Sequence, residues 1–165
     1  MNADLANGIG NLAQRTLSFI AKNAGAVIPP RGALAEADHA LLAVVDAMPE
    51  RVRAAVERLA FHEALDEIWR VIRAADGYID HQAPWSLRKT DPERMATVLH
   101  VLVCALRAIA LMLQPFLPDS AAKLLDQLGV AADARHFACL DAPVAEGTVL
   151  PPPAGLFPRF VEVAA

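Results

Sequence analysis

Apolar residues recur at helical spacing from the start of the chain. One stripe stands at positions i, i+4, i+7 and i+14, namely Leu5, Ile9, Leu12 and Phe19. A stripe of this period predicts a first helix from Asn2 or Ala3 to about Lys22. The next stretch, "NAGAVIPPRG", carries two prolines and two glycines and is expected to end that helix.

The same periodicity predicts two long helices in the following part of the chain. The first covers about residues 35–59, where Pro49 is expected to interrupt it and Asp46 to cap the second piece. The second covers about residues 61–81. Its predicted buried side consists of Leu65, Ile68, Trp69, Ile72 and Ile79.

The segment "APWSLRKTD" is expected to separate this third helix from a fourth. Pro84 disfavours the helical conformation of Ala83, so the third helix should stop there. Asp91 followed by Pro92 is a typical helix start, because the carboxylate caps free N–H groups and proline fits the first turn. The fourth helix is expected to reach about Leu113.

The stretch from Met95 to Leu117 is the most membrane-like part of the sequence. It nevertheless carries His100, Arg107 and Gln114. A central helix that is apolar on all sides and buried in a bundle explains it better than a bilayer span. We therefore expect no membrane association.

A short fifth helix and an extended tail are expected to complete the fold. The helix runs from Asp119 or Ser120 to Leu128 and is closed by Gly129. The tail becomes rich in proline and glycine toward its end, which predicts an extended segment packing back on the bundle. Its expected anchors are Leu156, Phe157 and Phe160.

These elements predict an all-α protein. We find no convincing strand alternation and no repeat of about 20 to 50 residues. The expected architecture is a bundle of about five helices over residues 1–129, with a C-terminal extension over residues 130–165.

Composition narrows the classes of function. The chain is 55% hydrophobic with a net charge of −4, so it is too apolar to be disordered and too acidic for a generic nucleic-acid binder. A local site that reads a few bases remains compatible with this charge. The two cysteines, Cys104 and Cys139, form no CxxC pair, and the first residues do not form a signal peptide. A cytoplasmic setting is expected.

The sequence offers no catalytic or metal-binding motif. "NGIGN" lies within a helical stripe rather than after a strand, and "HEALD" lacks the second histidine of a zinc-protease motif. The five histidines are scattered without metal-ligand spacing. We therefore expect no catalytic residue, no metal ligand and no cofactor in this chain.

Trp85 is the most informative single residue, since it follows a proline at a break between helices. One interpretation is a tryptophan that plugs the end of the core. The other is an exposed platform on which an unstacked base lies, a contact that stabilises binding by about 1–3 kcal/mol per base.

A polar line on the first helix bears on this choice. Asn7, Asn11 and Arg15 recur at i, i+4 and i+8 beside the apolar stripe. An amide can bond a base edge, and a guanidinium can donate two parallel hydrogen bonds or stack. The alternative is an ordinary solvated helix face.

Four segments in a fixed order resemble a known family. They are "NADLANGIGNLAQR", "GYIDHQAPW", "LRAIALMLQPFLP" and "LFPRFVE". Together they are similar to the C-terminal anticodon-binding domain of bacterial methionyl-tRNA synthetase, over nearly the whole chain. The resemblance implies an all-helical bundle, of the type found in class I aminoacyl-tRNA synthetases, that binds the CAU anticodon of methionine tRNAs and reads its cytosine most closely.

The resemblance also implies roles for particular residues. The family's "NLxxR" pattern falls on Asn11 and Arg15, its stacking tryptophan on Trp85, and the aspartate four residues before the proline on Asp80. Where the family often has "ANxYI", this chain has "ADGYI", so Asp76 replaces an amide with a carboxylate.

Charged residues near Trp85 are candidates for phosphate contacts. Arg88, Lys89 and Arg94 follow it closely and could attract the phosphates of the anticodon stem.

The family's ATP-site signatures and its zinc-binding insertion are absent from this sequence. ATP and zinc would belong to the catalytic part of the synthetase, which is expected as a partner together with the tRNA. The chain is then an excised domain, a fragment of a longer product or a free-standing bundle. The alternative function is a structural or protein-interaction bundle without RNA binding.

Overall fold

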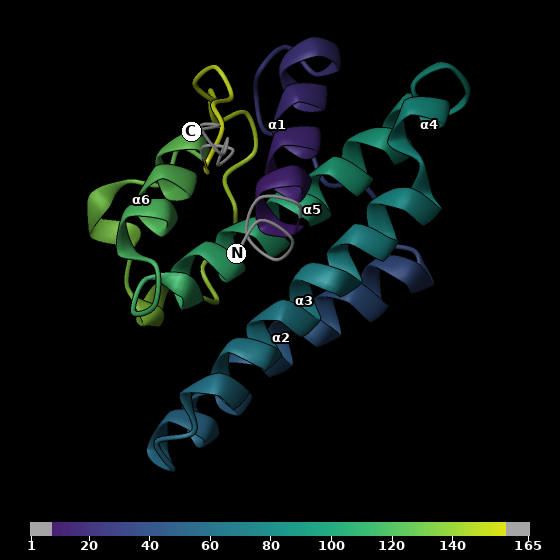
Figure 1. Cartoon of the computed structure of the whole chain (residues 1–165). Helices are drawn as coiled ribbons and strands as arrows, with labels where there is room; N and C mark the ends of the chain where they lie inside the picture. Colours follow the sequence, from purple (N-terminus) through teal and green to yellow (C-terminus); the bar gives the residue numbers. More distant parts are fainter. Residues whose placement is uncertain (1–7, 158–165) are drawn as a thin grey trace, which may run out of the picture.

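The computed structural model describes residues 8–157 and is all-α (Figure 1). A π-type turn over residues 8–10 leads into the first helix. Six α-helices follow within the described range: α1 (Asn11–Asn23), α2 (Glu36–Glu57), α3 (Phe61–Gln82), α4 (Pro84–Thr90), α5 (Pro92–Leu113) and α6 (Pro118–Gln127). Two short 3-10 turns, η2 (Ala132–Ala134) and η3 (Phe137–Cys139), lie in the tail. The expected all-α bundle is confirmed.

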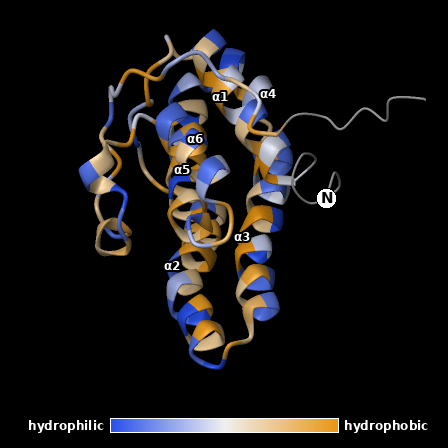
Figure 2. Ribbon diagram, turned by 60° about the vertical axis from the view of Figure 1, so that its left-hand side comes forward, coloured by the Kyte–Doolittle hydropathy of each residue, from blue (hydrophilic) through white to orange (hydrophobic). Residues whose placement is uncertain are grey.

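α2 and α3 form a long antiparallel hairpin that extends beyond the rest of the bundle (Figures 1 and 2). The expected interruption at Pro49 is wrong, because α2 runs through it without a break. A proline there removes one backbone bond, but the buried stripe continues on both sides of it and holds the helix against its neighbours. That stripe consists of Leu41, Val45, Met48, Val52 and Ala55.

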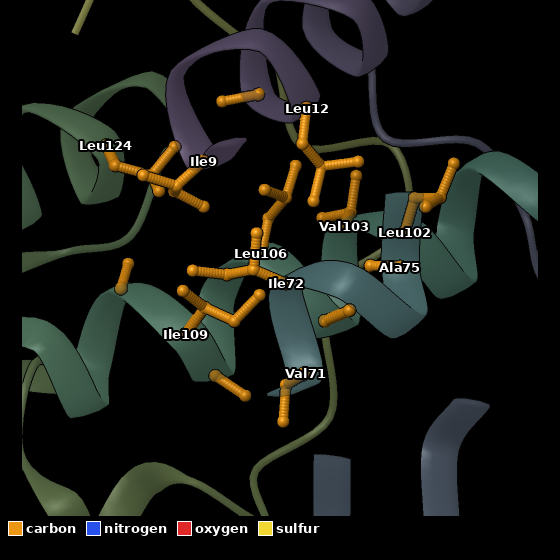
Figure 3. Close-up of a cluster of buried hydrophobic side chains, with 14 of the residues drawn as sticks. Ile9, Leu12, Val71, Ile72, Ala75, Leu102, Val103, Leu106, Ile109 and Leu124 are labelled. Carbon is orange, nitrogen blue, oxygen red and sulfur yellow. The ribbon is translucent and has the colours of Figure 1, made fainter. Parts of the chain in front are cut away.

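α5 is the central helix, and it is buried on almost every side. Side chains from α1, α3 and α6 converge on it, as Figure 3 shows for Leu12, Ile72 and Leu124 around Leu106. By length and composition alone, α5 is apolar enough to cross a membrane, yet 89% of its most apolar window is buried inside the protein. It is therefore placed as a core helix, as expected from its polar residues.

The segment between the third and fourth predicted helices is itself helical. It forms α4, which the sequence pattern did not reveal because this helix is only seven residues long. Ala83 adopts a left-handed conformation (φ 44°, ψ 61°), ends α3 by donating to the Ile79 carbonyl and precedes the first residue of α4. The helix break expected at Pro84 is confirmed.

The predicted end of the first helix and the predicted starts of α5 and α6 are close to those observed, whereas the predicted start at Asn2 or Ala3 lies outside the described residues. The Asp91 carboxylate accepts a hydrogen bond from the Arg94 N–H at 2.9 Å and so caps α5. α6 begins at Pro118, one residue before the earliest predicted start. Gly129 (φ 67°) has the left-handed conformation expected for a residue that terminates a helix.

The described part of the tail contacts the bundle at several points. An isolated antiparallel bridge joins Val27 to Val149, and the Ala154 N–H donates to the Gln127 side chain at 2.8 Å. Of the three expected anchors, Leu156 is buried and Phe157 packs against the core, whereas Phe160 lies outside the described residues.

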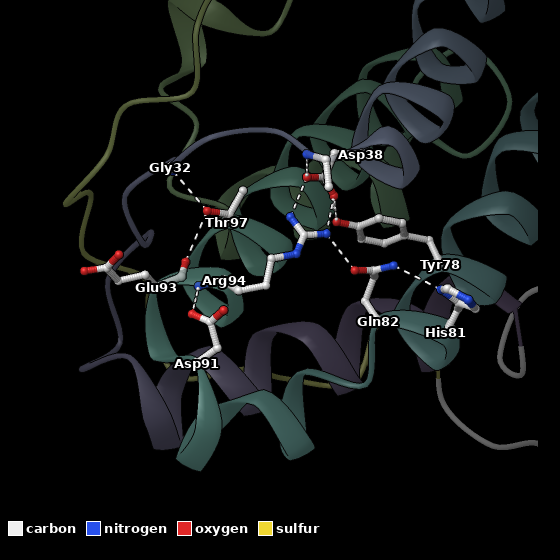
Figure 4. A network of polar contacts seen from close by, with 10 residues as sticks. Gly32, Asp38, Tyr78, His81, Gln82, Asp91, Glu93, Arg94 and Thr97 are labelled. Atoms are coloured by element: carbon white, nitrogen blue, oxygen red, sulfur yellow. Dashed lines mark hydrogen bonds and ion pairs between the residues drawn. The ribbon is translucent and has the colours of Figure 1, made fainter.

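A buried polar network ties α2, α3 and α5 together near the α3–α4 junction (Figure 4). Asp38 is fully buried and accepts hydrogen bonds from both terminal nitrogens of Arg94, at 2.5 and 2.7 Å. It also accepts from the Tyr78 hydroxyl at 2.5 Å and from the Ala35 N–H at 2.8 Å. Arg94 donates a further bond to Gln82 at 2.6 Å, so each group in the network has a partner.

These contacts set the ionisation of the network. Burial acts to raise the pKa of Asp38, but hydrogen bonds from Arg94, Tyr78 and the Ala35 N–H outweigh it and lower that pKa below its ordinary value. Burial and the Asp38 carboxylate raise the pKa of Tyr78, which therefore stays a hydroxyl donor. Asp38 is a buried anion that depends on Arg94 for its charge balance.

Removal of this guanidinium is expected to be strongly destabilising. Arg94→Met should lower the free energy of unfolding by about 3–5 kcal/mol, because it leaves a buried carboxylate without its counter-ion. Urea denaturation followed by circular dichroism measures this loss. The double variant Asp38→Asn/Arg94→Met should recover part of it, and a loss below about 1 kcal/mol for the single variant would contradict the assigned role.

Candidate nucleic-acid interface

Five predicted site residues come from three helices that meet at one corner of the bundle. Asn11 and Arg15 lie one turn apart near the start of α1, and Asp76 and Asp80 lie one turn apart near the end of α3. Trp85 is the second residue of α4. These residues are up to 74 positions apart in the sequence. The α3–α4 reversal and the packing of α1 beside α3 bring them together.

Arg15 lies at the centre of this cluster. One of its terminal nitrogens donates to the Asp80 carboxylate at 2.5 Å, and its guanidinium carbon lies 5.6 Å from the centre of the Trp85 ring. That distance is typical of a cation–π contact. Asp80 and Trp85 therefore hold the guanidinium from two directions, one by charge and one by its aromatic face.

Trp85 is an exposed platform and not a plug of the core. Its side chain is 46% exposed, whereas Pro84 is buried and Leu87 packs against the core. The inward residues of α4 thus fix the helix while the indole remains open to solvent. Arg88 adds a second attachment, because it donates to the side chain of Asn23 at the end of α1 at 2.9 Å.

The ion pair between Arg15 and Asp80 faces solvent. The Asp80 side chain is 63% exposed and that of Arg15 is 32% exposed. An inward pair beneath a buried tryptophan would favour a purely structural bundle. Here the pair is outward and the tryptophan is open, which favours a surface that binds a ligand.

Asp76 differs from Asp80 although both lie on the same face of α3. Its Oδ1 atom is buried and has no hydrogen-bond partner among residues 8–157. Burial raises the pKa of Asp76, the Arg15 charge lowers it, and the Asp80 charge raises it again. The first effect is the largest, so the pKa lies above its ordinary value. An unpaired buried acceptor of this kind is costly for the fold. The hydroxyl of Thr16 on α1 is a second buried group without a partner among the described residues.

The three residues predicted to contact phosphates lie in different environments. Arg88 and Lys89 are exposed on α4. Arg94 is paired with Asp38 and Gln82, and its side chain is only 18% exposed. The expectation that Arg94 attracts phosphates is therefore wrong, since its charge is committed to the interior.

Other predicted features lie elsewhere or outside the described range. Asn7, the first member of the polar line, lies outside the described residues. His100 is buried and bonds the Pro29 carbonyl at 2.9 Å. Cys104 is partly buried, and burial raises the pKa of its thiol to about 11. Within residues 8–157, no group of three or more His, Cys, Asp or Glu side chains could hold a metal ion.

A large apolar groove lies far from this cluster. It has a volume of about 750 Å³ and is formed by the second half of α2, the start of α3, the end of α5 and η3. Phe61 and Phe137, both 52% exposed, are among its lining residues. The α3 rise from Phe61 to Asp80 is about 30 Å. The groove therefore does not contribute to the cluster around Arg15.

Sequence reasoning missed two features of the site. The first is α4, whose inward Pro84 and Leu87 explain how Trp85 is held outward. The second is the unpaired Oδ1 of Asp76, since burial of one carboxylate oxygen depends on packing between helices. The only signal in sequence was the spacing of Asp76 and Asp80, which places both acids on one face of the helix.

Comparisons with known proteins agree with this arrangement. Residues 28–162 match a family model described as the anticodon binding domain of methionyl tRNA ligase. The methionine–tRNA ligase of Brucella suis is 54% identical over 162 residues, which cover 98% of this chain and 32% of that protein. That of Mycobacterium tuberculosis is 46% identical over 164 residues, covering 97% of this chain and 32% of the relative.

Solved structures show the same fold. The crystal structure of the apo form of Mycobacterium tuberculosis methionyl-tRNA synthetase matches with a TM-score of 0.94 and 46% identity, over 97% of this chain and 33% of that one. The same enzyme in complex with methionyl-adenylate also matches with a TM-score of 0.94, at 47% identity over 96% of this chain and 32% of that one.

The chain belongs to the family of anticodon-binding domains of methionyl-tRNA ligases. It spans about a third of the length of the curated relatives that it matches. The resemblance inferred from the four sequence segments is therefore confirmed.

The raised pKa of Asp76 has a consequence for the stability of the fold. Because the folded-state pKa lies above the ordinary value of 3.8, ionisation of Asp76 at neutral pH opposes folding. Asp76→Asn should raise the midpoint of thermal unfolding at about pH 7. The gain should shrink as pH falls through the folded-state pKa and should vanish well below 3.8, where the wild-type carboxyl is protonated in both states.

Thermal unfolding of both proteins across this pH range measures the difference directly. Asp66→Asn, on an exposed position of the same helix, is a matched control that should change the midpoint little. A destabilised Asp76→Asn variant at neutral pH would contradict the inferred cost.

Proposed function

We propose that this chain binds tRNA carrying a CAU anticodon, as the C-terminal part of a methionine–tRNA ligase that acts in translation in the cytoplasm. The observation that supports this most is the joint position of Arg15 over the exposed Trp85, beside Asn11 on the same helix face. Membership of the anticodon-binding family supports the same conclusion.

The chemistry of cytosine suits these side chains. Its pairing edge offers two acceptors, O2 and N3, and one amino donor. The guanidinium of Arg15 and the amide of Asn11 can donate to the two acceptors, while Trp85 stacks on the ring. A base with a different pattern leaves donors unpaired, and the loss of those bonds gives specificity.

The Asp80 pair prepares Arg15 for this task. Five N–H donors belong to a guanidinium, and the bond to Asp80 engages one of its terminal nitrogens. The carboxylate restricts the side chain before RNA arrives, so less conformational entropy is lost on binding. Asp80 thus acts through Arg15 in this proposal.

A net charge of −4 is compatible with this role because base reading relies on local contacts. Arg88 and Lys89 are proposed to attract the phosphates next to the anticodon. The catalytic part of the synthetase is the proposed partner of this domain, and ATP and zinc belong to that part. No cofactor is proposed for this chain.

Selectivity for the anticodon provides the first test of this function. A fluorescent anticodon stem-loop with CAU should bind the chain at least about tenfold more tightly than one with GAU, since guanine presents a different edge and a larger ring. Fluorescence anisotropy at fixed salt measures both affinities. Equal affinities for the two stem-loops would contradict the proposal.

The contribution of the platform provides a second test. Trp85→Ala should weaken binding of the CAU stem-loop by about 1–3 kcal/mol, or about five- to 150-fold, because the stacking surface is removed. Phe137→Ala is the matched control, since Phe137 has similar exposure at the distant groove. The assigned role fails if the two variants bind alike.

A further inference from the structure

A cavity of about 440 Å³ lies between α2, α5, the linker after α1 and the tail. Exposed charged side chains line it from three of these segments: Arg31 from the linker, Asp46 from α2 and Glu146 from the tail. His100 and Arg107 of α5 line it as well, and both are more than nine-tenths buried. A cavity of this size with a few polar groups is typical of a small-molecule site.

Arg107 brings a buried charge to this cavity that no carboxylate balances. Its terminal nitrogens donate to the Ala142 carbonyl at 2.6 Å and to the Cys139 carbonyl, which uses two of its five N–H donors and leaves its charge in place. Within residues 8–157 it forms no ion pair, whereas Arg94 has Asp38 as its counter-ion. Because buried charges are usually paired, a ligand with an anionic group would supply the missing counter-ion.

The exposed charges at the cavity are of both signs and are also unpaired. Arg31 and Asp46 form no ion pair with each other or with any other residue in the described part of the chain. Burial is the largest effect on the pKa of Cys104, which lines the same cavity, and raises it. Arg107 and Arg31 lower that pKa, and Asp46 raises it. The three charges therefore lie around a common space next to the thiol.

His100 adds a hydrogen-bond acceptor. Its Nδ1 bonds the Pro29 carbonyl at 2.9 Å, and since a carbonyl only accepts, Nδ1 carries the proton. The Nε2 of the neutral ring is then an acceptor, and it has no hydrogen-bond partner among the described residues. The cavity also has apolar walls, formed by residues such as Leu42, Val45 and Val144.

We propose that this cavity binds a small zwitterion, namely an α-amino acid with an apolar side chain. Arg107 and Arg31 bind its carboxylate, Asp46 and the Nε2 of His100 bind its ammonium group, and its side chain packs on the apolar walls. A ligand with only one charge would leave part of this set unpaired. None of the residues in the cluster around Arg15 lines the cavity, so the site is separate from the nucleic-acid interface.

Three probes of similar shape test whether both charged groups of the ligand are needed. L-norleucine carries both, hexanoate lacks the amino group and pentylamine lacks the carboxylate. The chain should bind norleucine at least about tenfold more tightly than either of the other two, because each of those loses a charge-assisted contact. Isothermal titration calorimetry at about pH 7 measures the three affinities.

Two variants at exposed positions test the charge assigned to each side chain. Asp46→Asn should bring the affinity for norleucine close to that for hexanoate, because the ammonium group loses its counter-ion. Arg31→Gln should weaken norleucine binding about tenfold but keep the preference over hexanoate. Asp66→Asn, an exposed position of α3 outside the cavity, is the matched control and should bind like the wild type. Circular dichroism verifies that each variant is folded.

The two cysteines give an independent readout of the location. Cys104 lines the cavity and Cys139 does not, although both are partly buried. Norleucine at about ten times its dissociation constant should slow maleimide labelling of Cys104 about tenfold and leave that of Cys139 unchanged. Burial raises the pKa of the Cys104 thiol to about 11, so labelling is slow and is followed by mass spectrometry at about pH 8.5.

The possible outcomes either support or overturn the site. Absence of norleucine binding, or equal slowing of both cysteines, overturns it. Hexanoate or pentylamine bound as tightly as norleucine overturns the assignment of a zwitterion, and wild-type norleucine affinity in both Asp46→Asn and Arg31→Gln overturns the assigned contacts. None of these measurements involves RNA, so their failure leaves the proposed anticodon binding untouched.

Discussion

The buried pair of Asp38 and Arg94 is the interaction on which the geometry of this domain depends. It joins the start of α2 to the start of α5 and, through Tyr78 and Gln82, to the last turns of α3. Apolar packing around α5 brings the helices together but does not by itself fix their rotation or register. A bidentate ion pair with fixed donor directions does, and it lies next to the reversal from α3 into α4.

Polar side chains within a short stretch of α3 lie in two different environments. Tyr78 faces inward and completes a network in which every group is paired. Asp76 and Asp80 face α1, and there one acid is paired and the other is not. Among the described residues, the hydroxyl of the buried Thr16 on α1 is the other buried group without a hydrogen-bond partner.

Much of the fold followed from periodicity and from the chemistry of helix ends. Asp91 and Pro92 predicted the start of α5, and polar residues within the apolar run predicted that α5 is a core helix. The predictions that were wrong concern positions where packing between helices decides the structure. Pro49 looked like a break, yet buried residues on both sides of it keep α2 continuous. Arg94 looked like a surface charge because its partner Asp38 is 56 residues away.

The sequence predicted which residues form the candidate site, but not their exposure or their hydrogen-bond partners. The spacing of Asn11 and Arg15, and the proline before Trp85, indicated which side chains to consider. Exposure of the indole, the direction of the Arg15 pair and the buried oxygen of Asp76 all depend on how α1, α3 and α4 meet. Periodicity within one helix carries no information on contacts between helices.

Ala83 positions the cluster through its backbone conformation. Its backbone is both the last cap of α3 and the entry to α4, so one pair of torsion angles orients the indole relative to the two aspartates. An alanine with a positive φ stores strain that only the surrounding packing sustains. A substitution that relaxes this backbone would therefore turn the indole away from the aspartates without changing any side chain of the cluster around Arg15.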